Sequence, residues 1–304
     1  MKYLVNSYFI FILVIVFVAC NKDDEIIIDS PVEDPSTSLG YSVIEYTPAP
    51  GQFINESVSG FQDITTMEAA CRQAEKRLST NDYVSLGAWG GYIVVKLNKS
   101  IENKDGYNFA IAGNSFDSSN EPGIVWVMQD SNHNGKPDDK WYELKGSYYG
   151  QPGYSNDYWV TYYRPEAKGN TLWKDSEGEE GYVNWIGTQH TQDFYYPNWV
   201  TADSYTLHGS RLPIRAEQNP VTGIWSNLPF EWGYVDNNGS DIIKLEVNGK
   251  TIEANSFKIL DAINEKGETV NLSSIDFIKV QTAINGSISI LGENSTEIRG
   301  IFAL

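Results

Sequence analysis

Cysteine and histidine are scarce in this chain, and the motifs that they would build are missing. The sequence contains two cysteines and three histidines. No HExxH or other close pair of zinc ligands occurs, and neither a GxSxG nucleophile elbow nor a glycine-rich phosphate loop is present. These absences disfavour zinc hydrolases, serine hydrolases and P-loop enzymes. They leave a glycosidase open, because its two carboxylates carry no short motif and the 40 acidic residues always supply some pair.

Positive charge is also in short supply. The chain has 22 lysine and arginine residues against 40 aspartate and glutamate residues, which gives a formal net charge of −18. Such a chain repels nucleic acid phosphates and anionic lipids, so we expect neither as a partner. An acid-rich surface does suit calcium and neutral or cationic ligands.

The N-terminal apolar run is too short to span a membrane. It covers residues 8–19, and a dozen residues make about 18 Å of helix, whereas about 20 residues are needed to cross a bilayer. Lys2 precedes the run and the small Ala19 ends it, which is typical of a secretory signal. Residues 1–19 are therefore predicted to be an export signal.

A cysteine follows this signal. Phe17-Val18-Ala19-Cys20 resembles the bacterial lipobox, although Phe17 replaces the more usual leucine. The resemblance implies that Cys20 is acylated and becomes the first residue of a chain that touches the membrane only through its lipid. Two or more acyl chains anchor stably, since each buried CH₂ contributes about 0.8 kcal/mol. The alternative is an ordinary cleaved signal with an incidental cysteine.

The residues after Cys20 indicate a sorting signal and a flexible tether. Residues 21–25 (NKDDE) resemble the lysine-plus-acid tag that directs lipoproteins of Bacteroides-like bacteria to the outer face of the outer membrane. Residues 26–40 contain prolines, serines and acids, so 20–40 is predicted to be a flexible tether. With Cys20 lipidated, Cys71 is the only remaining thiol, and no intrachain disulfide can form.

The remaining residues, 41–304, are predicted to form a mainly β, jelly-roll-like β-sandwich with one short N-terminal helix. Thr65 and Glu68 resemble a capping box before a helix over 67–78, and Cys71 falls on its apolar stripe, which favours a buried thiol over a nucleophile. From about Ile214 the chain either forms a second lobe or completes the same sandwich. Strands are predicted at 92–97, 109–113, 124–128, 141–144, 158–163, 205–208, 257–260 and 277–282.

A calcium loop is predicted within residues 130–139. Asp130, Asn132 and Asn134 present oxygens at alternate positions before Gly135, as at the start of an EF-hand loop. The expected ligands are therefore Asp130, Asn132, Asn134, the Lys136 carbonyl, Asp138 and Asp139.

Two features distinguish this loop from an EF-hand. Position 12 is Trp141 in place of a bidentate glutamate, so Asp138, Asp139 or Glu143 would have to substitute. No helix pair flanks the loop. A structural calcium is favoured, and the alternative is a solvated turn rich in Asx residues between two strands. A second acidic loop, 236–241, either holds another cation or only turns the chain, because Asn-Gly is itself a strong turn signal.

The long segment 121–146 (EPGIVWVMQDSNHNGKPDDKWYELKG) resembles a family. It is similar to the "cell surface protein" lipoproteins of gut Bacteroidetes, and the likeness extends over roughly 45–304. Some of these proteins are associated with outer-membrane nutrient uptake, including that of cobalamin. Other segments that carry the resemblance are 46–56, 85–95, 113–116, 157–165, 231–241, 257–282 and 291–298.

Aromatic residues concentrate between positions 141 and 200, where about half of the tryptophans and tyrosines lie. Flat aromatic faces edged by amides and carboxylates suit sugar rings and corrinoids. The alternative is that these rings fill the core, as alternate rings of 158–163 are expected to do. The candidate ligand-binding residues, taken from the loop-like pieces, are Tyr148, Tyr149, Tyr154, Trp185, Tyr195, Tyr196 and Trp199.

These observations support one preferred function and two alternatives. The preferred one is a non-catalytic lipoprotein that captures a nutrient, a corrinoid or a glycan, at the cell surface. It would pass this ligand to a TonB-dependent outer-membrane transporter, and it would contain structural calcium. The alternatives are a glycan-active hydrolase on the same scaffold and a surface adhesion protein with no small ligand.

Overall fold

The computed structural model describes residues 40–287 and 292–304. The predicted export signal, Cys20 and the tether before residue 40 lie outside the described residues. The described residues form β1 to β18 and one α-helix, which confirms the prediction of a mainly β fold with a single short helix. In this part of the chain, no helix has both the length and the apolar character needed to cross a membrane.

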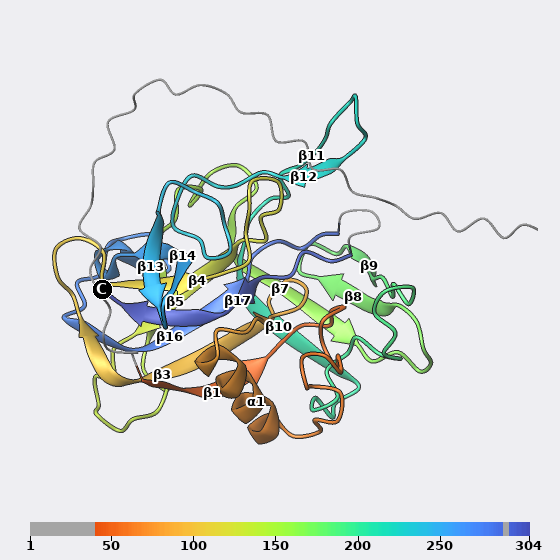
Figure 1. Ribbon diagram of the computed structural model, residues 1–304, viewed down its shortest axis with the longest axis horizontal. Coiled ribbons are helices and arrows are strands. Elements are labelled where there is room, and N and C mark those ends of the chain that lie inside the picture. Colours follow the sequence, from red (N-terminus) through yellow and green to blue (C-terminus); the bar gives the residue numbers. More distant parts are fainter. Residues whose placement is uncertain (1–39, 288–291) are drawn as a thin grey trace, which may run out of the picture. The chain divides into compact units, whose positions relative to one another are not determined.

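The largest sheet has six antiparallel strands (Figure 1). Its order does not follow the sequence, because β16, from near the C-terminus, lies between β3 and β5. The strands, in sheet order, are β1 (Tyr41–Thr47), β3 (Tyr92–Glu102), β16 (Ser274–Thr282), β5 (Gly123–Met128), β6 (Trp141–Leu144) and β15 (Ala262–Ile263).

One face of this sheet is the main core. Val95, Ile278 and Val127 pair in register across β3, β16 and β5, and each is fully buried. They share a hydrophobic cluster with Ile111 and Phe257 of a second sheet, so the two sheets form a sandwich. The order of strands in the sheets does not establish a jelly roll. The second sheet consists of β13 (Ile242–Val247), β14 (Lys250–Phe257), β4 (Phe109–Ala112) and β18 (Gly300–Ala303).

The helix α1 (Met67–Ser79) covers part of the same core. Its N-cap is Thr66, one residue after the predicted Thr65, and the Thr66 hydroxyl accepts a hydrogen bond from the Ala69 N–H at 3.2 Å. Cys71 is buried, and this burial raises the pKa of its thiol to about 11, which confirms a packing role. The face turned to the core consists of Ala70, Cys71, Ala74 and Leu78.

A third sheet carries an aromatic core of its own. It contains, in order, β10 (Ser204–Arg211), β7 (Ser155–Tyr163), β8 (Thr171–Asp175) and β9 (Glu180–Val183). Tyr158 and Tyr162 point inward from β7, as alternation predicts. Tyr158 packs edge-on against Trp89 with ring centroids 4.7 Å apart, and the Tyr162 hydroxyl donates to the Trp89 carbonyl at 2.8 Å.

Two short strand pairs complete the described structure. β2 (Val84–Ser85) pairs with β17 (Glu297–Ile298), and β11 (Ala216–Gln218) pairs with β12 (Trp225–Asn227). The β11–β12 hairpin, coloured teal, projects away from the sheets in Figure 1. Its tip is exposed and includes Val221 at 91% exposure.

The C-terminal residues complete the same body and do not form a second lobe. β16 occupies the interior of the six-stranded sheet, and β14 and β18 flank β4 in the second sheet. Every one of these strands follows Ile214. The sandwich therefore needs both ends of the described chain.

One predicted strand, 257–260, is wrong. β14 ends at Phe257, and a 3₁₀-helix, η1 (Ile259–Asp261), follows it. The Ile259 N–H donates to the Asn108 side-chain oxygen at 2.7 Å instead of to a neighbouring strand. Because this N–H is bonded to a side chain, it is not available for pairing with a neighbouring strand, and the strand ends.

Candidate ligand-binding groove

A row of side chains crosses the face of the six-stranded sheet opposite the main core. Residues directly paired across neighbouring strands project from the same face of a sheet. One register row therefore brings together residues from all six strands. In sheet order the row is Glu45, Val94, Lys279, Trp126, Glu143 and Ile263.

Two adjoining cavities, of about 380 Å³ and about 440 Å³, open over this row. They share Trp126, Trp141, Asn156 and Asp157, so we treat them as one feature, the sheet groove. Asn156 and Asp157 belong to β7, which supplies a wall that the six-stranded sheet lacks. The other lining residues are Glu45, Tyr92, Val94, Pro137, His208, Gly209 and Lys279 in one cavity, and Glu143, Tyr149, Tyr154, Ile263, Asn264 and Glu265 in the other.

The sheet groove is rich in partly exposed aromatic rings. Tyr92, Trp126, Trp141, Tyr149 and Tyr154 all line it, and none of them is fully buried or fully exposed. Such rings offer apolar faces to a ligand while their polar atoms remain available at the edges. A groove of this size and lining suits a small molecule with a flat apolar face.

Lys279 lies on the floor of the groove between two of these rings. Its Nζ is 4.5 Å from the centroid of the Tyr92 ring and 5.7 Å from that of Trp126, which are cation–π distances. Burial lowers the pKa of the Lys279 amine to about 8, against the opposing influence of Glu45. None of the ion pairs in the described part of the chain involves Lys279.

Glu143 provides a buried acid on the same floor. Only 4% of the residue is exposed, and the Tyr154 hydroxyl donates to its two carboxylate oxygens at 2.9 and 3.0 Å. The Ser210 hydroxyl is a second donor. Burial raises the pKa of Glu143 to about 7, while these hydrogen bonds act in the opposite direction. This carboxyl group therefore holds its proton to a higher pH than an exposed glutamate does.

The predicted aromatic residues near β7 divide into two kinds. Tyr149 and Tyr154 line the groove, and their ring centroids are 4.8 Å apart. Tyr148 is absent from the groove lining and packs edge-on against Phe230 at 5.2 Å, on a hydrophobic cluster that Tyr154 also contacts. Two of these three predicted tyrosines, Tyr149 and Tyr154, therefore lie in the groove.

The other four predicted residues lie elsewhere. Tyr195, Tyr196 and Trp199 are at most 5% exposed and belong to the hydrophobic cores, which corrects the prediction that they form a ligand surface. Trp185 is partly buried beside Lys168, whose Nζ is 4.5 Å from the ring. These rings stabilise the loop against the body because their large apolar areas are removed from water.

The predicted calcium loop follows β5 and closes on itself through its own side chains. The Asp130 carboxylate accepts from the N–H groups of Asn134 at 3.1 Å and Gly135 at 2.8 Å. The Asn134 side-chain oxygen accepts from the Lys136 N–H at 2.7 Å, and the Asn132 oxygen accepts from the Asn134 N–H at 3.0 Å. The loop is thus a series of Asx turns.

Asp138 and Asp139 approach this loop from its far end. Asn134 and Asn132 donate their amide N–H groups to Asp138, which lowers the pKa of that carboxyl group. Asp139 accepts from the Ser131 N–H at 3.0 Å. Asn132, Asn134 and Asp138 therefore contact one another, but the carboxylates of Asp130, Asp138 and Asp139 do not all lie within 4.8 Å of one another. Glu143 lies in the sheet groove.

The second acidic loop, 236–241, is fixed by hydrogen bonds to neighbouring segments. Asp241 accepts from the Gly233 N–H at 2.7 Å and from the Asn255 amide at 3.0 Å. The Asn237 side chain bonds both the N–H and the carbonyl of Phe230, at 2.7 and 2.9 Å. These contacts explain Asn237 and Asp241 as residues that fix a buried turn.

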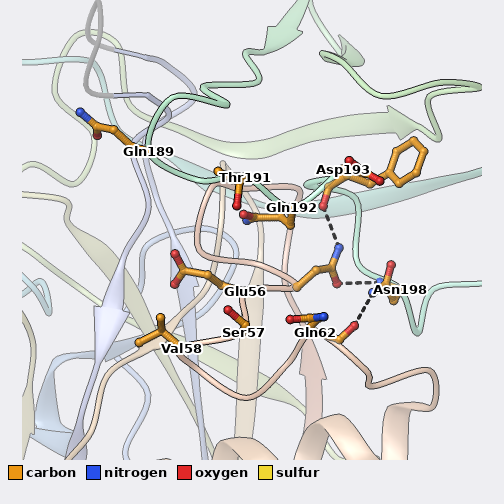
Figure 2. A pocket seen from close by; sticks show the side chains of 11 residues that line it. Glu56, Ser57, Val58, Gln62, Gln189, Thr191, Gln192, Asp193 and Asn198 are labelled. Carbon is orange, nitrogen blue, oxygen red and sulfur yellow. Dashed lines mark hydrogen bonds between the residues drawn. The ribbon is translucent and has the colours of Figure 1, made fainter.

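Another cavity, of about 500 Å³, is lined mostly by polar residues of 55–62 and 189–198 (Figure 2). Figure 2 shows that its amides bond the two segments together. Asn55 donates to the Phe194 carbonyl at 3.0 Å and accepts from the Asn198 N–H at 3.0 Å. Asn198 donates to the Gln62 carbonyl at 3.1 Å. With Phe194 as its only aromatic lining residue, this pocket suits a ring-shaped ligand less well than the sheet groove.

Sequence reasoning missed Tyr92, Trp126, Trp141 and Lys279. The available signal was Lys279 itself, a charge inside the apolar strand FIKVQT. Trp126 gave a weaker signal, since it is the only partly exposed residue of β5. Neither signal identifies its neighbours, because the register of six strands is needed to bring these residues together.

No protein-family model matches this chain, and a search of curated proteins finds no significant match. The class of this protein therefore rests on its fold and its candidate site. It is a mainly β protein with a groove of aromatic, acidic and amide side chains on one sheet face.

Proposed function

We propose that this chain is a lipoprotein of the outer-membrane surface that captures a nutrient in the sheet groove and passes it to a TonB-dependent transporter. The observation that supports this proposal is the set of partly exposed rings around Lys279 and Trp126. A non-catalytic binder needs an apolar platform with a few polar groups that fix orientation, and the groove provides both.

A corrinoid is the preferred ligand class. Its macrocycle is a flat apolar face surrounded by amide side chains, which can donate to carboxylates such as Asp157 and Glu265 at the groove edge. Lys279 adds one cation for an acceptor oxygen or phosphate. A glycan is the second class, because sugar rings also stack on tryptophan faces.

The test is calorimetric titration of the full chain, purified in detergent, with cyanocobalamin. We expect saturable binding that Trp126→Ala weakens at least tenfold. The matched control is Trp225→Ala, which removes an exposed tryptophan from the β11–β12 hairpin and should leave affinity unchanged. Equal affinity of wild type and Trp126→Ala would place the ligand elsewhere, and absence of binding would move the proposal to glycans, tested on an array.

A second candidate function, a glycan-active hydrolase, is favoured by Glu143. A carboxyl group with a pKa of about 7 keeps a proton near neutral pH, as a general acid must. Asp157 supplies a second carboxylate in the same groove. In this case the purified chain would release soluble products from a polysaccharide, and Glu143→Gln would abolish the release while retention of the polysaccharide persists.

Calcium in the loop 130–139 completes the proposal. The carboxylates of Asp130 and Asp138 and the side-chain oxygen of Asn134 are hard oxygens of the kind that calcium prefers, and hydrogen bonds within the loop bring Asn134 against both acids. Pro137 of this loop lines the groove, so an ion here would hold one groove wall in place. We expect Asp130→Ala and a chelator each to lower the melting temperature, because an ion bound only by the folded state stabilises it. Unchanged melting in both experiments would make the loop a simple turn.

A further inference from the structure

Three carboxylates meet away from the sheet groove and the loop 130–139, and one of them, Asp236, is the first residue of the second acidic loop. Glu121 precedes β5, Asp236 lies in the loop before β13, and Glu297 belongs to β17. One carboxylate oxygen from each residue lies within 4.8 Å of the other two. Asp236 is 2% exposed and Glu297 is 5% exposed, so two members of the cluster are almost completely removed from water.

Backbone groups hold these side chains in position. Asp236 accepts from the Asn114 N–H at 2.6 Å and from the Glu297 N–H at 2.9 Å. Glu121 accepts from the Ser295 N–H at 3.0 Å. Asp236 also has a φ of 57°, a left-handed conformation that is uncommon outside glycine. The fold therefore maintains this meeting of acids at some conformational cost.

The cluster has no cationic partner among residues 40–287 and 292–304. Within the described residues, the ion pairs involve none of the three acids. Burial, together with the neighbouring carboxylates, raises the pKa of Glu121 and Glu297 well above the usual range. Three carboxylates at this separation, two of them almost completely buried, favour either bound protons or a bound cation.

One buried carboxylate oxygen of the cluster lacks a hydrogen-bond partner, which favours a bound cation over protons alone. Oε1 of Glu297 is buried and has no hydrogen-bond partner in the described structure. Such an atom normally costs free energy, and a metal ion is one of the few groups that satisfies it. Oε2 of Glu293, a 4% exposed residue whose charge acts on both Glu121 and Glu297, is unpaired as well.

We propose that Glu121, Asp236 and Glu297 bind a calcium ion, at a site separate from the loop 130–139. Two oxygens bound to one calcium at 2.3–2.6 Å are at most about 5 Å apart, which accommodates the observed separation. The donor set contains only oxygens, as a hard divalent cation requires. The Asn114 amide, 3.4 Å from Oε2 of Glu297, is a further neutral ligand once its oxygen faces the ion.

The ion would act as a structural crosslink. It would tie the start of β5, the 236–241 loop and the β2–β17 pair together through segments that are distant in sequence. These segments also bond one another, since the Glu121 N–H donates to the Asp236 carbonyl at 3.1 Å. Loss of the ion would therefore loosen the packing of several strands at once.

Native mass spectrometry of the full chain, reloaded with calcium chloride after chelation, tests this proposal. The variant Asp130→Ala/Asp138→Ala removes the loop ligands, and we expect it to retain one tightly held calcium. Glu121→Gln/Glu297→Gln, which keeps side-chain size, should carry one calcium fewer than wild type. Glu253→Gln changes an exposed acid on β14 and is the matched control, with the wild-type count.

Two results would overturn the site. One is an Asp130→Ala/Asp138→Ala chain that binds no calcium and whose melting temperature calcium does not raise. The other is a Glu121→Gln/Glu297→Gln chain that binds as many ions as wild type, which would mean that the acids carry protons instead. If the glutamine variant fails to fold, the loop variant alone decides, because its ion count and melting do not depend on that substitution.

Discussion

At the scale of single residues, the sheet groove contains buried charged side chains that a sheet face does not need for stability. Val95, Ile278 and Val127 fill the core row, whereas the adjacent row on the opposite face places Lys279 and Glu143 on either side of Trp126. Burying an ammonium and a carboxyl group lowers stability unless each is well paired. We interpret this row as a site where the fold gives up stability for binding.

Replacing Lys279 by methionine tests that interpretation. Methionine matches the length of the lysine stem and removes the poorly solvated charge, so the free energy of unfolding should stay the same or rise by about 1 kcal/mol. Ligand affinity should fall at least tenfold in the same variant. Urea denaturation and calorimetry measure the two quantities. A clear loss of stability with full affinity would show that Lys279 is structural.

The raised pKa of Glu143 predicts that the free energy of unfolding depends on pH. Because folding raises its pKa from 4.5 to about 7, its contribution is fully present below about pH 4.5 and is lost as the pH rises through 7. The loss is on the order of 3 kcal/mol for a shift of this size. Glu143→Gln should therefore show a smaller fall in unfolding free energy between pH 5 and 8 than wild type. Parallel pH profiles for the two chains would contradict the assignment.

At the scale of elements, local patterns predicted most of the secondary structure. Seven of the eight predicted strands are present, and the helix has its predicted apolar face. These predictions succeeded because runs of valine, isoleucine and aromatic residues between turns depend on neighbours in sequence. The strand at 257–260 failed because the Asn108 side chain, far away in sequence, captures the Ile259 N–H.

The N-cap of α1 offers a sharp test at this scale. The Thr66 hydroxyl, not that of Thr65, bonds the Ala69 N–H. Thr66→Ala should lower the free energy of unfolding by about 1 kcal/mol, since it leaves a helix N–H without its partner. Thr65→Ala is the matched control and should change stability by less than about 0.5 kcal/mol. The reverse ranking in urea denaturation would restore the predicted capping box.

At the scale of the whole molecule, the candidate sites could be predicted only where their residues are close in sequence. The loop 130–139 was recognisable because its oxygens alternate within ten positions. The sheet groove was not, since its row takes one residue from each of six strands. The carboxylate cluster was visible only in part: the acidic loop that begins at Asp236 was recognised as a possible cation site, but its partners Glu121 and Glu297 are far away in sequence.

The prediction about aromatic residues succeeded for the region and failed for several single rings, because local sequence does not determine burial. Their concentration between 141 and 200 was visible in the sequence, but burial is decided by packing with distant strands. Tyr196 packs edge-on against Tyr205 at 5.2 Å and belongs to the core, while Tyr154 reaches Glu143 and lines the groove. Composition could therefore indicate an aromatic region without separating the binding rings from the core rings.

A crystal structure of the chain soaked with cyanocobalamin would show whether the sheet groove binds the ligand. We expect the corrinoid to contact Trp126 and Trp141, with Lys279 near an acceptor oxygen of the ligand. Ligand density in the polar pocket of Figure 2, or an empty groove at saturating cyanocobalamin, would contradict it.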